Sequence, residues 1–238
     1  MHSLRVIVTT CKPYYWAIRP FSFLFNRYWS EQQPVVIAGY EPLDIELVDS
    51  QYCYDNFSFL SIDANTYPAN RWSDGIIKLL HRLPDDYFVW MLEDMWLNRL
   101  VDWQSVESLA EYARGRDDIL RIDLTTDRLY AHDPRYIPRH DRWGRIDIIA
   151  SQPDWPYHVS LQAGIWNRSK LLAILQPGMT PWEFELQGQA RLAGHSWQVL
   201  GTRQIPLSYA LTLRGPTGIS LDGLHPDDLD DLRQIGYV

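Results

Sequence analysis

The stretch Tyr87-Phe-Val-Trp-Met-Leu92, followed at once by Glu93-Asp94, decides how the rest of the chain is interpreted. Its six apolar residues are too few to cross a bilayer and fit a strand covered on both faces. The two carboxylates stand where that strand leaves the sheet. In open α/β sheets, ligands bind beyond the carboxyl ends of the strands. The acidic pair is therefore either a ligand or metal site or a helix N-terminal cap, and both interpretations stay open at this point.

Strand-like and helix-like patterns alternate on both sides of this stretch. We expect further strands at residues 4–8, 35–38, 57–62, 119–124, 146–150, 158–166, 197–200 and 207–213. We expect helices at residues 13–28, 74–83, 103–114, 169–175, 180–194 and 226–235, with Pro20 kinking or dividing the first and Ser73 capping the second. This order predicts an α/β fold with a mostly parallel sheet covered by helices on both faces. Residues 125–158 are irregular and rich in Arg, Asp and Pro, which indicates a functional loop or lid or a disordered segment.

Length and composition narrow the classes of protein. A chain of 238 residues suits one well-filled domain, so we expect residues 1–238 to form a single domain. The net charge of −8 does not indicate a nucleic-acid-binding surface, whereas 11 Trp and 14 Tyr favour a sugar or nucleotide ligand modestly. The chain has no run of roughly 20 apolar residues and no signal-peptide pattern at its start. With Cys11 and Cys53 as the only cysteines, it is expected to be cytoplasmic.

A second acidic motif, Thr180-Pro-Trp-Glu183, also has two interpretations. Thr180 and Glu183 have the spacing of a helix capping box. Alternatively, Glu183 or Glu185 is a general base, because Trp182 and Phe184 would desolvate the carboxylate and raise its pKa. The sequence contains no GxSxG, P-loop, GxGxxG or HExxH motif, so serine hydrolase, P-loop kinase, dinucleotide oxidoreductase and zinc protease have no motif support.

Six motifs in order along nearly the whole chain resemble nucleotide-sugar-dependent glycosyltransferases of the GT-A fold, closest to small bacterial and phage-type members. They are Thr9-Thr-Cys-Lys-Pro-Tyr14, Leu24-Phe-Asn-Arg-Tyr-Trp29, Trp72-Ser-Asp74, Leu92-Glu-Asp-Met-Trp-Leu97, Ser160-Leu-Gln-Ala-Gly-Ile-Trp166 and Pro181-Trp-Glu-Phe-Glu185. The resemblance implies a GT-A-like, Rossmann-related sheet, with a nucleotide-sugar-binding half at 1–124 and an acceptor-binding half at 125–238.

The resemblance also implies roles for individual residues. The residues on the donor side would be Thr9, Thr10, Cys11, Asp63, Trp72, Asp74 and Glu93. The residues on the acceptor side would be Gln162, Trp182 and Glu185. Asp94 would occupy the place of the DxD motif and hold the metal–diphosphate, and Glu183 matches the catalytic aspartate of inverting members. Because Met95 departs from DxD, dependence on a divalent cation (Mg²⁺ or Mn²⁺) stays open.

These observations predict an inverting glycosyltransferase in which a carboxylate base activates a hydroxyl acceptor. A carbohydrate or lipid-linked acceptor is favoured over DNA because of the net charge. Glycosylation of hydroxymethylated bases in phage DNA stays an alternative, because Arg128, Arg135, Arg139, Arg142 and Arg145 lie close together in sequence. A non-catalytic nucleotide- or sugar-binding module is a second alternative. A nucleotidyltransferase is a third, although residues 9–13 lack the glycines of a phosphate loop.

Overall fold

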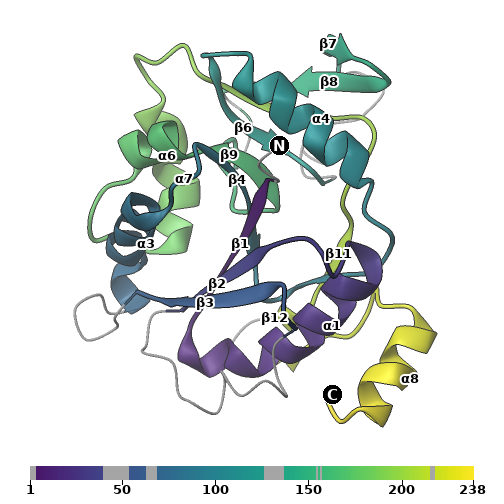
Figure 1. Cartoon of the computed structure of the whole chain (residues 1–238). Coiled ribbons are helices and arrows are strands. Elements are labelled where there is room, and N and C mark those ends of the chain that lie inside the picture. Colours follow the sequence, from purple (N-terminus) through teal and green to yellow (C-terminus); the bar gives the residue numbers. More distant parts are fainter. Residues whose placement is uncertain are drawn as a thin grey trace.

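The computed structural model describes residues 4–39, 54–62, 69–125, 137–153, 155, 157–214 and 218–238. Its centre is a nine-stranded sheet with the order β3-β2-β1-β4-β9-β6-β10-β8-β7 (Figure 1). The sheet strands are β1 (Arg5–Thr10), β2 (Val35–Gly39), β3 (Phe57–Ser61), β4 (Tyr87–Leu92), β6 (Ile119–Asp123), β7 (Arg139–Trp143), β8 (Ile146–Ala150), β9 (Gly164–Asn167) and β10 (Gln198–Thr202). Strands β9 and β8 run against their neighbours, and the other strands share one direction. The predicted α/β class with a mostly parallel sheet is confirmed.

Helices cover both faces of this sheet. The α-helices are α1 (Ile18–Tyr28), α3 (Trp72–Arg82), α4 (Trp103–Arg114), α6 (Arg168–Ile174), α7 (Pro181–Arg191) and α8 (Pro226–Gln234). Two 3-10 helices, η1 (Lys12–Ala17) and η2 (Ala69–Arg71), precede α1 and α3. Two small two-stranded sheets pair β5 (Met95–Leu97) with β11 (Tyr209–Leu211), and β12 (Leu213–Arg214) with β13 (Gly218–Ile219).

Strand β4 is apolar on both sides because it is sandwiched between two helical layers. Val89 and Met91 pack in a core that includes α1 and α4. Phe88 and Trp90 face the opposite way, into a core formed with α3, α6 and α7. Figure 1 shows α3, α6 and α7 on one side of the sheet and α1 and α4 on the other. The alternation of side chains along a strand accounts for this division.

Several element boundaries differ from the sequence-based expectation. Pro20 does not divide a helix, because it lies in the first turn of α1, where a missing N–H costs nothing. The break comes earlier, where η1 meets α1. Ser73 is not the cap of α3, which begins at Trp72 with Arg71 in the cap position. The strand expected at 158–166 is present only as β9, and residues 158–163 do not form a strand.

Strands from both predicted halves form the one central sheet. β9, from the C-terminal half, pairs with β4 on one side and with β6 on the other, antiparallel in both cases. β10 then pairs parallel with β6. Across the described residues, no helix is both long enough and apolar enough to cross a membrane.

Candidate active site

A pocket of about 570 Å³ opens at the carboxyl ends of β1 and β4. Its wall contains nine residues that the sequence singled out: Thr9, Thr10, Cys11, Trp72, Glu93, Asp94, Gln162, Trp182 and Glu185. The remaining wall residues were assigned no individual binding role from the sequence: Tyr14, Leu92, Met95, Leu161 and Pro181 lie within the motifs, and Leu211 lies outside them. Most of these are direct neighbours in sequence of residues with a predicted role. The pocket is lined by residues from both halves of the chain.

Glu93 and Asp94 form the turn between β4 and β5. Because a strand follows them, they cap no helix, and the cap interpretation of this pair is wrong. The main chain of the turn is held by its surroundings. The Trp96 indole donates to the Glu93 carbonyl at 3.0 Å. The backbone N–H and the hydroxyl of Thr212 donate to the Asp94 carbonyl at 3.0 and 3.1 Å.

The pKa values of both carboxyls in this turn are raised, which favours the neutral acids. Burial, together with the neighbouring charge of Asp94, raises the pKa of Glu93 to about 8. Burial also raises the pKa of Asp94 to about 6. The Oδ1 atom of Asp94 is buried and has no hydrogen-bond partner among the described residues. A buried oxygen without a partner, beside a second carboxyl, is a place where a cation or a hydrogen-bond donor of a ligand would be stabilised.

The donor set at this turn fits one kind of metal binding. No group of three or more Cys, His, Asp or Glu side chains that could hold a metal ion is found among the described residues. Mg²⁺ is commonly held by one or two carboxylates together with phosphate oxygens of a ligand. Glu93 and Asp94 supply that number. The residues present therefore suit a cation that arrives with a diphosphate, and not a site built wholly from protein ligands.

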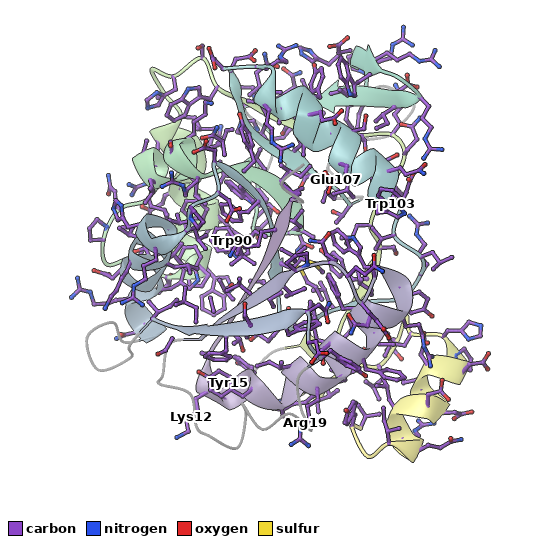
Figure 2. The ribbon with its side chains drawn as sticks, viewed as in Figure 1. Lys12, Tyr15, Arg19, Trp90, Trp103 and Glu107 are labelled. Atoms are coloured by element: carbon purple, nitrogen blue, oxygen red, sulfur yellow. The ribbon has the colours of Figure 1, made fainter. Side chains whose placement is uncertain are left out.

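Buried aromatic rings form the support beneath the pocket. Trp72 of α3 lies in the pocket wall and stacks on Trp90 of β4, with ring centroids 5.8 Å apart and an interplanar angle of 14°. The Trp90 indole donates to the hydroxyl of Thr9 at 3.0 Å. Figure 2 shows Trp90 in the interior of the molecule. This contact ties β4 to the end of β1, so the positions of Thr9 and Trp72 depend on one buried indole.

The N-terminus of α7 separates the two candidate bases. Glu183 is exposed, and its Oε2 accepts from the backbone N–H and the hydroxyl of Thr180 at 2.7 and 2.9 Å. The reciprocal bond from Glu183 N to Thr180 Oγ1 completes a capping box. These hydrogen bonds lower the pKa of Glu183, so the expectation that desolvation raises it is wrong. Glu183 also lies outside the set of pocket-lining residues.

Glu185, in contrast, lies in the pocket wall and is half-buried. Its Oε1 accepts from the backbone N–H of Leu161 at 2.7 Å, which joins α7 to the segment before β9. Trp182, one turn earlier on the pocket rim, is 71% exposed. The pocket rim therefore presents a carboxylate and an open indole face from the same helix.

The Trp-Ser-Asp motif holds the loop before α7 through contacts between residues far apart in sequence. Ser73 Oγ accepts from Met179 N at 2.8 Å, and an Asp74 carboxylate oxygen accepts from Gly178 N at 2.7 Å. Arg71 also forms an ion pair with Asp74 at 2.8 Å. Asp74 is not among the pocket-lining residues and instead anchors the loop that leads into α7. Asp63, predicted on the donor side, lies outside the described residues.

A fully buried arginine supports the opposite wall. Arg121 on β6 donates from Nη2 to the Gln162 carbonyl at 2.7 Å and forms an ion pair with Asp123. Its guanidinium carbon lies 5.0 Å from the ring centroid of Trp166. A Cβ atom at Gly164 would lie 3.0 Å from Arg121 Nε and 3.0 Å from the Ile122 carbonyl oxygen, so a larger residue there would require these neighbours to shift by a few tenths of an ångström. The sequence did not reveal this arrangement, because an arginine inside a strand pattern reads as a solvent-facing residue.

Two of the three described arginines considered for DNA binding pair with acids, and the third, Arg142, donates from Nε to the Gly144 carbonyl at 3.2 Å. Arg128 and Arg135 lie outside the described residues. Arg139 pairs with Asp147 at 3.5 Å, and Arg145 pairs with Asp102 at 2.8 Å. Their charges are therefore partly balanced by neighbouring acids on and near the β7–β8 hairpin.

Comparison with known proteins gives structural likenesses only. No protein-family model matches the chain, and no curated protein matches it in sequence. A cytidylyltransferase from Leptospira borgpetersenii is 10% identical with a TM-score of 0.50, over 99% of this chain and 95% of that one. TarS residues 1–349 from S. aureus are 12% identical with a TM-score of 0.52, over 98% of this chain and 64% of that one. Glucosyl-3-phosphoglycerate synthase from Mycobacterium tuberculosis, solved with Mn²⁺ and UDP, is 13% identical with a TM-score of 0.48, over 89% and 72%.

The first two likenesses extend over nearly the whole chain and concern its fold. Together with the strand order they establish the class of the molecule, an α/β fold of the GT-A-like, Rossmann-related type. At these identities the likeness is one of fold and not of residues. The roles of individual side chains therefore rest on the geometry of the pocket.

Proposed function

We propose that this chain is a glycosyltransferase that moves a sugar from a nucleoside diphosphate donor to a hydroxyl acceptor. The observation that carries the proposal is the meeting of Glu93 and Asp94, at the end of the central strand, with Glu185 and Gln162 from the other half of the chain in one pocket. Transfer of a sugar needs a place for a diphosphate leaving group and a separate base for the acceptor. The two carboxylate positions on different walls support that division of labour.

On the donor side, Thr9, Thr10, Cys11 and Trp72 would bind the nucleotide beside the acidic turn. Diphosphate and carboxylates repel each other, so the acidic turn requires a positive charge between them. Glu93 and Asp94 would hold a divalent cation there, which when bound would neutralise the charge that develops on the leaving diphosphate. The raised pKa values of these two residues then imply that donor and cation binding displaces protons from them.

On the acceptor side, we assign the general base to Glu185 in place of Glu183. Glu185 lines the pocket and Glu183 does not, although both carboxylates accept hydrogen bonds within the protein. Glu185 would take the proton of the acceptor hydroxyl as its oxygen attacks the anomeric carbon. The bond from that carbon to the diphosphate breaks on the opposite face, so the configuration inverts. Trp182 and Gln162 would orient the acceptor.

Three matched substitutions test these roles. The donor is first identified by a thermal-shift screen of UDP-, GDP- and TDP-sugars with and without Mn²⁺, since a bound donor stabilises the native state. With that donor, Glu185→Gln is expected to lower release of nucleoside diphosphate by about 10²-fold or more, as for the loss of a general base. Asp94→Asn is expected to abolish stabilisation by the donor with Mn²⁺. Glu183→Gln is the control and should retain activity within a few-fold.

Several results of these experiments would contradict the proposal. Full activity of Glu185→Gln with loss of activity in Glu183→Gln would return the base to Glu183. Unchanged turnover after chelation would remove the cation from the proposal. Stabilisation by a nucleotide sugar without hydrolysis or transfer to any acceptor would favour the non-catalytic binding module.

A nucleotidyltransferase is the second candidate, because the likeness to the Leptospira cytidylyltransferase covers 95% of that chain. Such an enzyme would release pyrophosphate from CTP, whereas a glycosyltransferase releases a nucleoside diphosphate. Measuring both products from the same preparation separates the two. Against this candidate, residues 9–13 contain no glycine for a phosphate loop.

For the acceptor, we propose a carbohydrate or a lipid-linked sugar, used in the cytoplasm. The partial pairing of Arg139 and Arg145 with acids supports this choice over DNA. Duplex DNA binding that weakens steeply with salt would favour the DNA acceptor instead.

A further inference from the structure

A second pocket, of about 330 Å³, lies at the opposite end of the sheet from the candidate active site. Its wall comes from the residue before β1, the turn before β2 and the first turns of α4: Leu4, Trp29, Ser30, Gln32, Gln33, Trp103, Val106 and Glu107. Residues 5–8 of β1 lie between Leu4, in this wall, and Thr9, in the wall of the candidate active site, which corresponds to roughly 16 Å between those two residues. We call this hollow the Trp29–Trp103 pocket.

Two indoles form the apolar part of the Trp29–Trp103 pocket. Trp29 is half-buried and stacks on Phe25, with centroids 5.0 Å apart and an interplanar angle of 24°. Trp29 is therefore fixed in place before any ligand binds. Trp103, the first residue of α4, is 55% exposed. An exposed indole beside a hollow offers a large flat contact surface at a low cost in conformational entropy.

Polar groups surround the two indoles, and hydrogen bonds within the protein hold Gln33 and Glu107. Gln33 Nε2 donates to the Leu4 carbonyl at 2.7 Å, and Leu4 N donates to Glu107 Oε1 at 3.4 Å. Ser30 Oγ accepts from Gln32 N at 3.0 Å. Figure 2 shows Trp103 and Glu107 on α4, where the spacing of four residues puts them on the same face of the helix. Within the described part of the chain, the second carboxylate oxygen of Glu107, the Gln33 Oε1 and the Gln32 side-chain amide have no hydrogen-bond partner in the protein.

The charge of the wall narrows the class of ligand. Among the described residues of the wall, Glu107 is the charged one, and none of them is Lys, Arg or His. A phosphate or another anion would be repelled, so the pocket is not a second nucleotide site. A purely apolar ligand would leave the amides and the carboxylate without partners, which is costly. The wall suits an uncharged ligand that has an apolar face and several hydroxyl groups at its edge.

We propose that the Trp29–Trp103 pocket is a carbohydrate-binding site for one uncharged pyranose ring. The C–H face of a pyranose packs on an indole, and its equatorial hydroxyls both donate to carboxylates and accept from amides. The volume lies at the low end of the roughly 300–1,000 Å³ of small-molecule sites, which suits a single ring. The proposal uses none of the residues assigned to transfer and is independent of the proposed function.

Saturation-transfer NMR on the full chain tests the proposal, with the methyl glycosides of glucose, galactose and N-acetylglucosamine as probes. At least one probe is expected to receive saturation at its ring C–H protons. Trp103→Ala should reduce that affinity about 10-fold or more, and Glu107→Gln should reduce it several-fold. Trp143→Ala, on the 41% exposed indole of β7, is the control and should leave the binding unchanged.

Choline is the opposing probe, since two indoles and a carboxylate also form cages for quaternary ammonium ions. Binding of choline that is lost in Trp103→Ala, with no binding of the glycosides, would overturn the sugar assignment. Absence of saturation transfer to every probe would overturn it, and so would glycoside binding that is lost in Trp182→Ala but retained in Trp103→Ala. A near-ultraviolet circular dichroism spectrum of each variant shows that it is folded.

Discussion

At the scale of single residues, the acidic turn opposes stability. Glu93 and Asp94 are neighbours in a place where burial favours the neutral acid. Perturbed carboxyls of this kind concentrate at functional sites. Ionisation of these carboxyls is unfavourable in the folded state, and a bound cation or ligand would reduce that cost. The acidic turn therefore indicates a binding role better than a structural one.

Substitution of Glu93 should make this cost measurable. Because the pKa of Glu93 is about 8 in the folded protein and about 4.3 in an unfolded chain, the unfolded chain loses the proton first as pH rises. The wild type therefore loses stability from this residue between about pH 4 and pH 8. Glu93→Gln should be at least about 1.4 kcal/mol more stable, relative to wild type, at pH 8 than at pH 5.

Urea unfolding of both proteins at the two pH values measures this difference. Glu111→Gln, on the exposed side of α4, is the matched control. Parallel pH profiles for Glu93→Gln and wild type would contradict the burial of a protonated carboxyl at this turn.

Arg121 is a second residue whose substitution should change the free energy of unfolding strongly, because its side chain is buried. Arg121 and Asp123 have fully buried side chains, and removing one partner of a buried ion pair costs about 3–5 kcal/mol. Arg121→Met is therefore expected to lower the free energy of unfolding by that amount in urea titration. Arg145→Met, which breaks the pair with Asp102 at a 66% exposed arginine, should cost at most about 1 kcal/mol. Equal losses of unfolding free energy in the two variants would show that burial of Arg121 does not increase the stability of the folded protein.

At the scale of elements, α7 shows where sequence reasoning succeeds and where it fails. The spacing of Thr180 and Glu183 is a local pattern, and the capping box it predicts is present. The direction in which each side chain faces is not local. Of the two neighbours expected to desolvate Glu183, Trp182 is 71% exposed and Phe184 is fully buried. The two aromatic residues look alike in sequence and differ only in what packs over them.

The capping box can be tested through its threonine. Thr180→Ala removes the side chain that accepts from Glu183 N, and loss of an N-cap costs about 0.5–2 kcal/mol. We expect a decrease of that size in the free energy of unfolding, with faster amide exchange in the first turn of α7. Glu183→Gln is the control, because a glutamine can still accept at the third position of the box. A stability loss in Glu183→Gln as large as that in Thr180→Ala would contradict this account.

Some elements were predicted in both kind and extent, whereas the contacts between distant elements were not predicted. The apolar run of β4 and the helical spacing of α4 were assigned to their observed ranges, Tyr87–Leu92 and Trp103–Arg114. The hydroxyl of Ser73 was expected to cap α3, yet it holds Met179 N across 106 residues of sequence. A hydrogen bond of that range has no signature in a single chain, so the anchoring of α7 by the Trp-Ser-Asp motif could not be predicted.

At the scale of the whole molecule, alternation of helices and strands was enough to predict the α/β class and the helical layers. The reversed orientation of β9 was not predictable. Its four residues, Gly164–Asn167, read as one more apolar strand, and nothing local marks them as running against β4 and β6. Nine residues to which the family resemblance assigned roles line one pocket, whereas Arg121 was missed because its position depends on this reversed strand.

The position of β9 also has a consequence for how the chain folds during synthesis. β4 and β6 are made first, yet neither pairs with the other, and the strand that joins them arrives some forty residues after β6. Until then, β4 has one open edge and β6 has two, and open strand edges are templates for pairing with other chains. β9 joins β4 to β6, and β10, at Gln198–Thr202, then joins β6 to β8. We therefore expect the cooperative folding step, with its protection from aggregation, to come after the ribosome has passed residue 202.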